Sequence, residues 1–226
     1  MLALDAVHAT GAAHRDLKME NIGIDASGYP LLLDFGHAAA MPAPGMGLLG
    51  SVGTRHMMPP EMMLGRPHDR TCDVWALGVL LVDVLTGWPP FGLDPLADAR
   101  ALAGGRPARL APALRRVCTL GPIGGLSPEL GDLLGGLLAW NTWDRPSWDA
   151  VRGHPWFAGL DWHALAAGRL PAPLAEMGLP RGAGGGGGSE PMVAVLRAME
   201  GAALAESAGA PAAGGDGAGV DAGARG

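Results

Sequence analysis

The chain has few cysteines and a single lysine, and both scarcities exclude classes of protein. Its two cysteines, Cys72 and Cys118, stand far apart in 226 residues, without C-x-x-C spacing. We therefore expect neither a structural zinc site nor a disulfide framework, and a reducing compartment is the simpler interpretation. Lys18 is the only lysine, and basic residues nowhere cluster beyond pairs such as Arg115–Arg116. The positive patch that would attract nucleic acid or a membrane surface is missing.

Long apolar runs are also missing. The longest run, Val74 to Leu85, is interrupted by Gly78 and Asp83 and is too short to span a bilayer. We interpret it as a buried helix. No basic segment precedes an apolar stretch at the N-terminus, so no secretory signal is predicted. With a formal net charge of −6, these features favour a cytoplasmic protein with neither nucleic-acid nor membrane partners.

Glycine and proline, by contrast, are abundant, with 38 and 20 residues. Such an excess is typical of loops and low-complexity segments. From Arg181 onward the composition changes to a polyglycine run, Gly184 to Gly188, and an Ala/Gly-rich end at 207–226. We predict that 181–226 is a disordered tail. Hydrophobic residues make up 48% of the chain, enough for one core in the remainder.

The apolar periodicity predicts a mainly helical protein with one small hairpin. Ile22 to Ile24 and Leu31 to Leu33 are short apolar runs around the turn residues 25–28, which favours a hairpin. Residues 36–60 have little periodicity and are predicted to form a long functional loop, and 104–125 an irregular insertion. Thr71 and Gly87 are expected to cap the central helix. The predicted helices are the end of one at 1–9, then 71–86, 94–103, 127–140 and 146–152.

The residues suited to catalysis or metal binding lie within the first 36 positions. The run from His14 to Asn21 contains a carboxylate, Asp16, a cation, Lys18, and an amide, Asn21, and Asp34 follows thirteen residues later. Asn and Asp oxygens are hard donors suited to Mg²⁺. Phosphoryl transfer needs this set: an oriented hydroxyl, a clamped triphosphate and a metal that neutralises charge. Taken singly, each of these residues is better explained as an ordinary turn residue, but the ordered pattern argues against that explanation.

The pattern resembles the C-terminal, large lobe of eukaryotic protein kinase catalytic domains. The resemblance rests on His14-Arg15-Asp16-Leu17-Lys18-Met19-Glu20-Asn21 and Asp34-Phe35-Gly36, and it continues downstream. It implies a mainly α fold with a small β-hairpin at the catalytic loop and an absent N-terminal β-lobe. The downstream matches are Gly53-Thr54 with Pro59-Pro60-Glu61, the run Asp73 to Val79, and Asp144-Arg145-Pro146-Ser147.

The resemblance also implies roles for individual residues. Asp16 matches the catalytic aspartate, Lys18 lies near the transferred phosphoryl group, and Asn21 and Asp34 match the two metal ligands. Asp73 is expected to hold the backbone of the catalytic loop, and Arg145 to pair with Glu61. The implied cofactors are ATP and Mg²⁺. The expected catalytic set is Asp16, Lys18, Asn21 and Thr54, and the expected cofactor-binding set is Lys18, Glu20, Asn21, Gly23 and Asp34.

A subgroup is indicated by motifs further along the chain. The runs Gly87 to Phe91 and His154 to Phe157, with Asp161-Trp162 behind them, resemble the cyclic-nucleotide-dependent branch of the AGC kinases. In that branch two acidic residues hold an arginine of the substrate, and Glu20 and Asp83 occupy those positions. The resemblance therefore implies a Ser/Thr substrate with an upstream arginine. A capping role for Asp83 with a solvated Glu20 is an equally good alternative.

Departures from the family pattern bear on activity. Gly23 stands where a large aliphatic residue usually floors the adenine pocket. The glycine-rich runs at Gly45-Met46-Gly47 and Gly184 to Gly188 are not followed by a predicted helix, so we interpret them as linkers and not as a nucleotide-binding loop, and no strand lysine occurs in the chain. We therefore expect a serine/threonine kinase that is truncated at its N-terminus and weak or inactive alone, with a separate N-lobe or regulatory partner. The alternatives are a pseudokinase-like protein-binding module and a gene fragment without a stable function.

The expected organisation has three parts. Residues 1–158 form the kinase large lobe, 159–180 an AGC-like C-terminal extension, and 181–226 the Gly/Ala-rich tail.

Overall fold

The computed structural model describes residues 1–91 and 127–172. The predicted helix at 94–103, the insertion at 104–125, Cys118 and the predicted tail at 181–226 lie outside the described residues. Within the described part no helix is long and apolar enough to cross a membrane.

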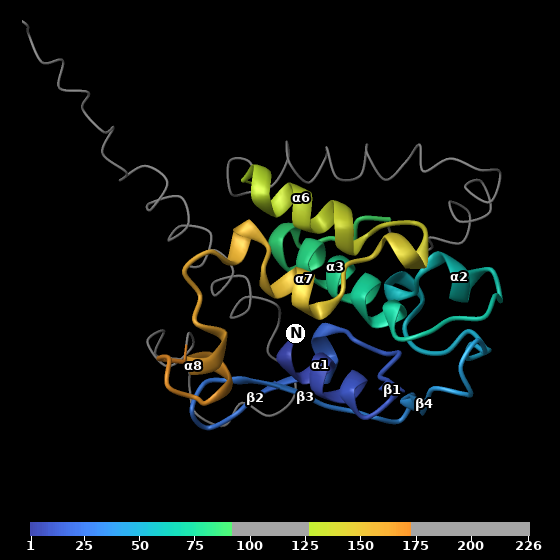
Figure 1. The fold of residues 1–226 in the computed structure, drawn as a ribbon, viewed down its shortest axis with the longest axis horizontal. Coiled ribbons are helices and arrows are strands. Elements are labelled where there is room, and N and C mark those ends of the chain that lie inside the picture. Colours follow the sequence, from blue (N-terminus) through green and yellow to red (C-terminus); the bar gives the residue numbers. More distant parts are fainter. Residues whose placement is uncertain (92–126, 173–226) are drawn as a thin grey trace, which may run out of the picture.

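The core is built around one buried helix, α3, Thr71–Thr86 (Figure 1). Its apolar residues face neighbours on almost every side, and Val79 and Val82 have no exposed surface. Gly87 ends it in the left-handed conformation at φ 73°, as the sequence predicts. The N-cap prediction was wrong. Thr71 lies inside the helix, and the Asp69 carboxylate accepts from the Thr71 N–H at 2.8 Å.

Shorter helices contribute buried residues to the core around α3. Helix α1, Leu2–Ala9, and α6, Pro128–Leu137, contribute Leu4 and four buried leucines to the same core. The serines before α6 and α7, Trp148–Arg152, cap the first turn of each helix. Both helices are shorter than their predicted ranges. Helix α8, Trp162–Ala166, follows the short 3₁₀ turns at Thr142–Asp144 and Pro155–Phe157.

The strands form two separate antiparallel pairs. Strand β2, Ile22–Ile24, pairs with β3, Pro30–Leu32, so that Gly23 faces Leu31. This is the predicted hairpin, shifted by one residue at its second strand. Strand β1, Ala12–Ala13, pairs with β4, Ala39–Ala40, and joins the start of the loop that begins at His14 to the segment after Asp34-Phe35-Gly36.

The predicted loop at 36–60 has more structure than its sequence indicated. Besides β4 it contains a 3₁₀ turn, Arg55–Met57, and it runs into a short helix, α2, Pro60–Met63, that was not predicted. Leu48 pairs with His68 through two backbone hydrogen bonds of 2.8 and 2.9 Å. Long-range pairing of this kind has no signature in local periodicity.

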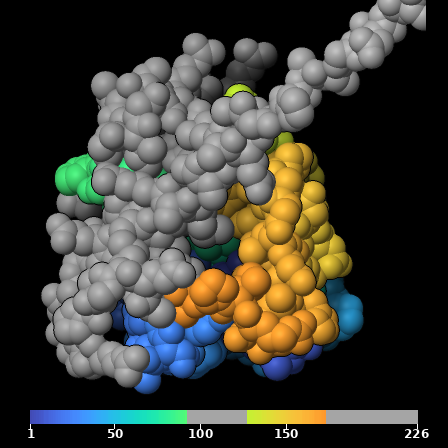
Figure 2. Space-filling view, turned by 90° about the vertical axis from the view of Figure 1, so that its left-hand side faces the viewer, coloured from blue at the N-terminus to red at the C-terminus, as the bar shows by residue number. Residues whose placement is uncertain are grey.

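The C-terminal described residues fold back onto the hairpin. Figure 2 shows this segment in orange against the blue N-terminal residues. The Tyr29 hydroxyl, at the end of the β2–β3 turn, donates to the Leu170 carbonyl. The Trp162 ring packs edge-on against Phe157, and its N–H donates to the Arg152 carbonyl at 2.9 Å. The segment after residue 158 is thus attached both to the β2–β3 turn and to the end of α7.

Candidate active site

The loop from His14 to Asn21, the predicted catalytic loop, is held in place by one buried carboxylate. Asp73 in α3 has no exposed surface, and its two oxygens accept from the His14 and Arg15 N–H groups at 2.8 Å each. Arg15 has a positive φ of 68°, a strained conformation for a side-chain-bearing residue. Two hydrogen bonds to a buried charge offset that strain. The expectation that Asp73 holds this backbone agrees with the geometry.

The Asp16 carboxylate lies at the centre of the site and is 4% exposed. One oxygen, Oδ1, accepts from the Thr54 N–H at 2.9 Å and from the Thr54 hydroxyl at 2.8 Å. The other, Oδ2, accepts from Lys18 Nζ at 3.0 Å and from Asn21 Nδ2 at 3.1 Å. Two carboxylate oxygens offer about four lone-pair positions. All the acceptor positions of Asp16 are therefore taken by its own chain.

This arrangement keeps Asp16 ionised. Burial alone would raise the pKa of its carboxyl group, but the hydrogen bonds from Lys18 and Thr54 and the charge of Lys18 outweigh burial and lower the pKa below its usual value. At neutral pH the group is a carboxylate that accepts hydrogen bonds. It is suited to orienting a hydroxyl more than to removing a proton early in a reaction.

Gly53 allows Thr54 to reach Asp16. The backbone there has φ 88°, and a Cβ on Gly53 would lie 2.3 Å from the Arg15 carbonyl oxygen. No other residue type fits this approach without backbone movement. The Thr54 hydroxyl also accepts from Lys18 Nζ at 3.1 Å. Residues almost forty positions apart thus form one hydrogen-bonded cluster: Asp16, Lys18, Asn21 and Thr54.

The two predicted metal ligands lie on adjoining segments. The Asn21 amide nitrogen donates to the Asp16 carbonyl and carboxylate, which leaves the amide oxygen for a cation. Asp34 is exposed at φ 58°, its Oδ1 accepts from Gly36 N–H at 3.0 Å, and Leu33 just before it bonds to the Asn21 carbonyl at 2.8 Å. Among the described residues no three His, Cys, Asp or Glu side chains gather around one point. Two hard oxygens fit Mg²⁺, which completes its shell with water and substrate phosphate.

Leu33 fills the space that Gly23 leaves. A Cβ on Gly23 would lie 2.8 Å from Leu33 Cδ1, so the leucine side chain covers the glycine from the neighbouring strand end. Leu33 is 44% exposed. An aliphatic surface is therefore present beside the site, although the sequence position expected to supply it carries no side chain. No local sequence pattern indicates this contact, because it depends on the hairpin register.

Glu20 and Asp83 come within electrostatic range of each other. Burial raises the pKa of Asp83, the charge of His56 opposes this shift, and the charge of Glu20 adds a smaller increase. The Asp83 side chain makes no hydrogen bond with a described residue, so it caps no helix turn there. His56 was not singled out from the sequence. It lies two residues beyond Thr54 and brings a titratable group to this acidic pair.

Glu61 and Arg145 form the expected buried ion pair. Arg145 donates to both carboxylate oxygens, at 2.7 and 2.8 Å, and its side chain is fully buried. It also donates to the Thr71 and Ala139 carbonyls and lies 5.1 Å from the centre of the Trp75 ring. The pair ties α2 to the start of α3 and to the turn before α7.

One buried thiol adjoins the site. Cys72 is free, and burial raises its pKa well above the usual value, so it is a neutral, packed side chain.

Comparison with known proteins assigns the family. A model of the protein kinase domain matches residues 1–157. The chain is 34% identical over 185 residues to mouse cGMP-dependent protein kinase 2, covering 76% of this chain and 22% of that protein. It is 34% identical over 181 residues to human ribosomal protein S6 kinase alpha-4, with 77% and 22% covered. It is 35% identical over 180 residues to the serine/threonine-protein kinase sck2 of Schizosaccharomyces pombe, with 77% and 26% covered.

The chain belongs to the protein kinase domain family. Its resemblance to cGMP-dependent and S6 kinases confirms the predicted relationship to the AGC group. The chain spans about a fifth of the length of the first of these relatives.

Proposed function

We propose that the chain carries the substrate- and metal-binding half of a serine/threonine protein kinase, with Asp16 as its central catalytic residue. The observation that carries the proposal is the cluster in which Lys18, Asn21 and Thr54 all hydrogen-bond to Asp16. Ordinary turn residues would not converge on one buried carboxylate from segments almost forty residues apart. The names of the relatives, which include serine/threonine kinases, point the same way.

Because all hydrogen-bond acceptor positions of the Asp16 carboxylate are occupied, a substrate hydroxyl needs a position there to be vacated. A serine or threonine hydroxyl can donate to this carboxylate only if one of the present donors leaves. Lys18 is the donor best able to move, because its side chain is 24% exposed and its ammonium group is not part of the backbone. In our proposal Lys18 turns toward the transferred phosphoryl group, where its charge is more useful. Asn21 and Thr54 keep the carboxylate oriented.

Asn21 and Asp34 would hold Mg²⁺ through one amide and one carboxylate oxygen. When bound, the ion neutralises charge on the phosphates of ATP. Gly23 and Leu33 supply an apolar surface beside this position, and Lys18 and Glu20 lie at its edge.

The substrate is proposed to carry an arginine that binds between Glu20 and Asp83. Burial raises the pKa of Asp83, and the charge of Glu20 adds a smaller increase against the charge of His56, so a guanidinium bound near both carboxylates would stabilise their ionised forms. His56 makes this subsite less acidic than two carboxylates alone would.

A further lobe or regulatory protein is proposed to cover the hairpin side of the site. Four large apolar side chains at or just after the hairpin, Ile24, Leu31, Leu33 and Phe35, are 44% to 52% exposed. Exposed apolar patches of this kind mark interaction surfaces. The chain alone is therefore expected to be a weak or inactive enzyme. An intracellular, cytoplasmic setting is proposed with it, since the buried Cys72 is a free thiol.

The proposal is tested with the purified 226-residue chain, Mg²⁺, ATP and a serine peptide containing an upstream arginine. Mg·ATP binding is measured by calorimetry and phosphate transfer by radiolabel. We expect weak binding that Asp34→Asn abolishes, while Asp25→Asn, in the hairpin turn, leaves binding unchanged. Binding that survives Asp34→Asn would contradict the assignment of the metal ligand.

The arginine subsite has its own test. Where transfer is measurable, Glu20→Gln and Asp83→Asn should lower kcat/KM for the arginine peptide but not for a peptide with alanine in its place. Glu129→Gln, an exposed acid on α6, is the charge-matched control. Equal losses on both peptides would reject the subsite.

A further inference from the structure

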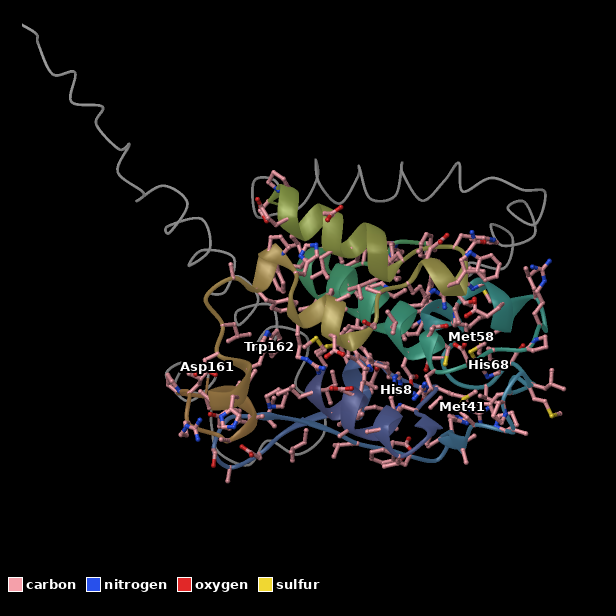
Figure 3. All side chains as sticks on the ribbon, viewed as in Figure 1. His8, Met41, Met58, His68, Asp161 and Trp162 are labelled. Carbon is pink, nitrogen blue, oxygen red and sulfur yellow. The ribbon has the colours of Figure 1, made fainter. Side chains whose placement is uncertain are left out.

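A buried chain of hydrogen bonds links α7 to the catalytic loop through His8. The Trp148 indole N–H donates to His8 Nδ1 at 2.8 Å, and His8 Nε2 lies 2.7 Å from Asp73 Oδ2. The same Asp73 oxygen accepts from the His14 backbone N–H at 2.8 Å. The three side chains are at most 7% exposed. Figure 3 labels His8, which lies where α1 faces α3.

The first contact determines the protonation pattern of the imidazole. An indole N–H is only a donor, so the His8 nitrogen that faces it must be an acceptor. In a neutral ring the proton then resides on Nε2, from which it donates to the Asp73 carboxylate. The opposite tautomer would place two N–H groups against each other at Nδ1. It would also place a lone pair against the carboxylate at Nε2.

The second contact determines where the carboxylate points. Asp73 accepts the His14 and Arg15 amides with different oxygens, so rotating it would break both bonds. Donation from His8 to Oδ2 opposes that rotation. Since Arg15 is held at φ 68° next to Asp16, the orientation of Asp73 bears on the position of the Asp16 carboxylate.

Packing alone does not explain Trp148. Its ring lies tilted at 43° to the His8 ring with centroids 5.4 Å apart, and a phenylalanine would fill much of the same space. A nearby buried tryptophan, Trp156, is 8% exposed, and its N–H has no partner among the described residues. Burial of an indole here therefore does not require the hydrogen bond that Trp148 makes.

We propose that Trp148 is a positioning residue for the catalytic loop, acting through the tautomer of His8 and the orientation of Asp73. The relay couples α7, near the C-terminal end of the helical core, to the residues around Asp16. Its consequence for catalysis rests on the proposed kinase function, whereas its geometry does not.

The test compares the full chain with Trp148→Phe, with Trp156→Phe as the matched control. ¹⁵N NMR of labelled histidine reports the tautomer, and hydrogen exchange reports the His14 and Arg15 amides. In the unaltered chain we expect His8 to carry its proton on Nε2. Trp148→Phe should produce a mixture of forms and exchange at His14 and Arg15 that is roughly 5- to 10-fold faster. Trp156→Phe should change neither.

Two results would overturn the relay. One is an Nδ1 proton on His8 in the unaltered chain, a measurement that needs no variant to fold. The other is a Trp148→Phe protein with unchanged tautomer and amide exchange. Where phosphate transfer is measurable, Trp148→Phe should lower kcat with little change in the KM for ATP. If Mg·ATP binding is absent or survives Asp34→Asn, the proposed function fails while the NMR results still decide the relay.

Discussion

Glycines determine how closely the segment before Thr54 approaches the loop that carries Asp16. Gly53 is the clearest case, because it combines a positive φ with a backbone oxygen in the space of its missing Cβ. Gly11 has a similar φ of 80° but nothing within 4 Å of a Cβ. Substitutions at the two positions therefore distinguish the energetic cost of the left-handed backbone from that of a steric clash.

Gly53→Ala is expected to destabilise the chain more than Gly11→Ala does. Left-handed backbone costs an alanine about 1 kcal/mol or more at either site, and Gly53→Ala adds the clash with the Arg15 carbonyl. We expect about 2–4 kcal/mol in total for Gly53→Ala, within the range of severe single substitutions. Urea denaturation of both variants measures the difference. Equal losses would show that the Gly53 approach is relaxed in solution.

At the scale of elements, the Leu48–His68 pairing anchors the segment between β4 and α2. His68 is 2% exposed, and its ring nitrogens make no hydrogen bond with described residues. Figure 3 labels it beside the helix α2 region with Met41 and Met58. His68, the neighbouring residues of the 67–70 turn and Met41 line an open cavity of about 540 Å³. A neutral, buried imidazole makes this contact sensitive to acid.

Stability should fall as the pH drops below about 6.5. Burial and then the charge of Arg15 lower the pKa of His68, against the opposing effects of the Arg66 carbonyl, Glu61 and Asp69. The unfolded chain therefore binds this proton more readily, and the unfolding free energy declines between pH 6.5 and the lowered pKa. The contribution is complete above pH 6.5, and one proton limits the slope to about 1.4 kcal/mol per pH unit.

Denaturant titrations between pH 5 and pH 7.5 check this expectation. His68→Asn should flatten the dependence, whereas His163→Gln, at an exposed position, should leave it as it is. An unchanged slope in His68→Asn would assign the pH dependence to other groups.

The Glu61–Arg145 pair joins elements that are 84 positions apart. Arg145→Met should destabilise the chain by about 3–5 kcal/mol, because Glu61 is left buried without its partner. Asp149→Ala, which removes an exposed partner of Arg152, should cost no more than about 1 kcal/mol. Thermal or urea unfolding of the two variants measures this contrast, and similar losses would mean that water reaches Glu61.

At the scale of the whole molecule, the residues after 158 close the structure against the hairpin. The Tyr29 hydroxyl donates to the Leu170 carbonyl across this contact, while Trp162 attaches the same segment to the end of α7. The contact places this segment on the turn between β2 and β3, so residues from both sides of the proposed boundary at 158 touch each other.

Tyr29→Phe tests this closure. Loss of one hydrogen bond, worth about 1 kcal/mol, should raise amide exchange at Arg169 about fivefold, because the Leu170 contact no longer holds this end. Amides of α3 are the internal reference and should not change. Exchange that stays constant throughout would show that Trp162 alone holds the segment.

Features that depend on residues close in sequence were predicted, whereas features that depend on distant residues were not. The α3 helix, the β2–β3 hairpin and the cluster of Asp16, Lys18 and Asn21 follow from local patterns, since each uses residues close in sequence. Helix α2, the Asp69 cap and the Leu48–His68 pairing were not predicted, because each depends on contacts outside a local window. The covering of Gly23 by Leu33 was missed for the same reason.

The identity of the chemical groups comes from the order of residues along the chain: the His14 to Asn21 run, Asp34-Phe35-Gly36 and the acidic residues Glu20 and Asp83. That order also indicated the family. Folding alone shows that Asp16 has no free acceptor, that Leu33 replaces the missing side chain of Gly23, and that Trp148 contacts His8. No linear pattern encodes these contacts. Thr54 reaches Asp16 from almost forty residues away, Leu33 covers Gly23 because of the hairpin register, and Trp148 meets His8 only when α7 packs near α1.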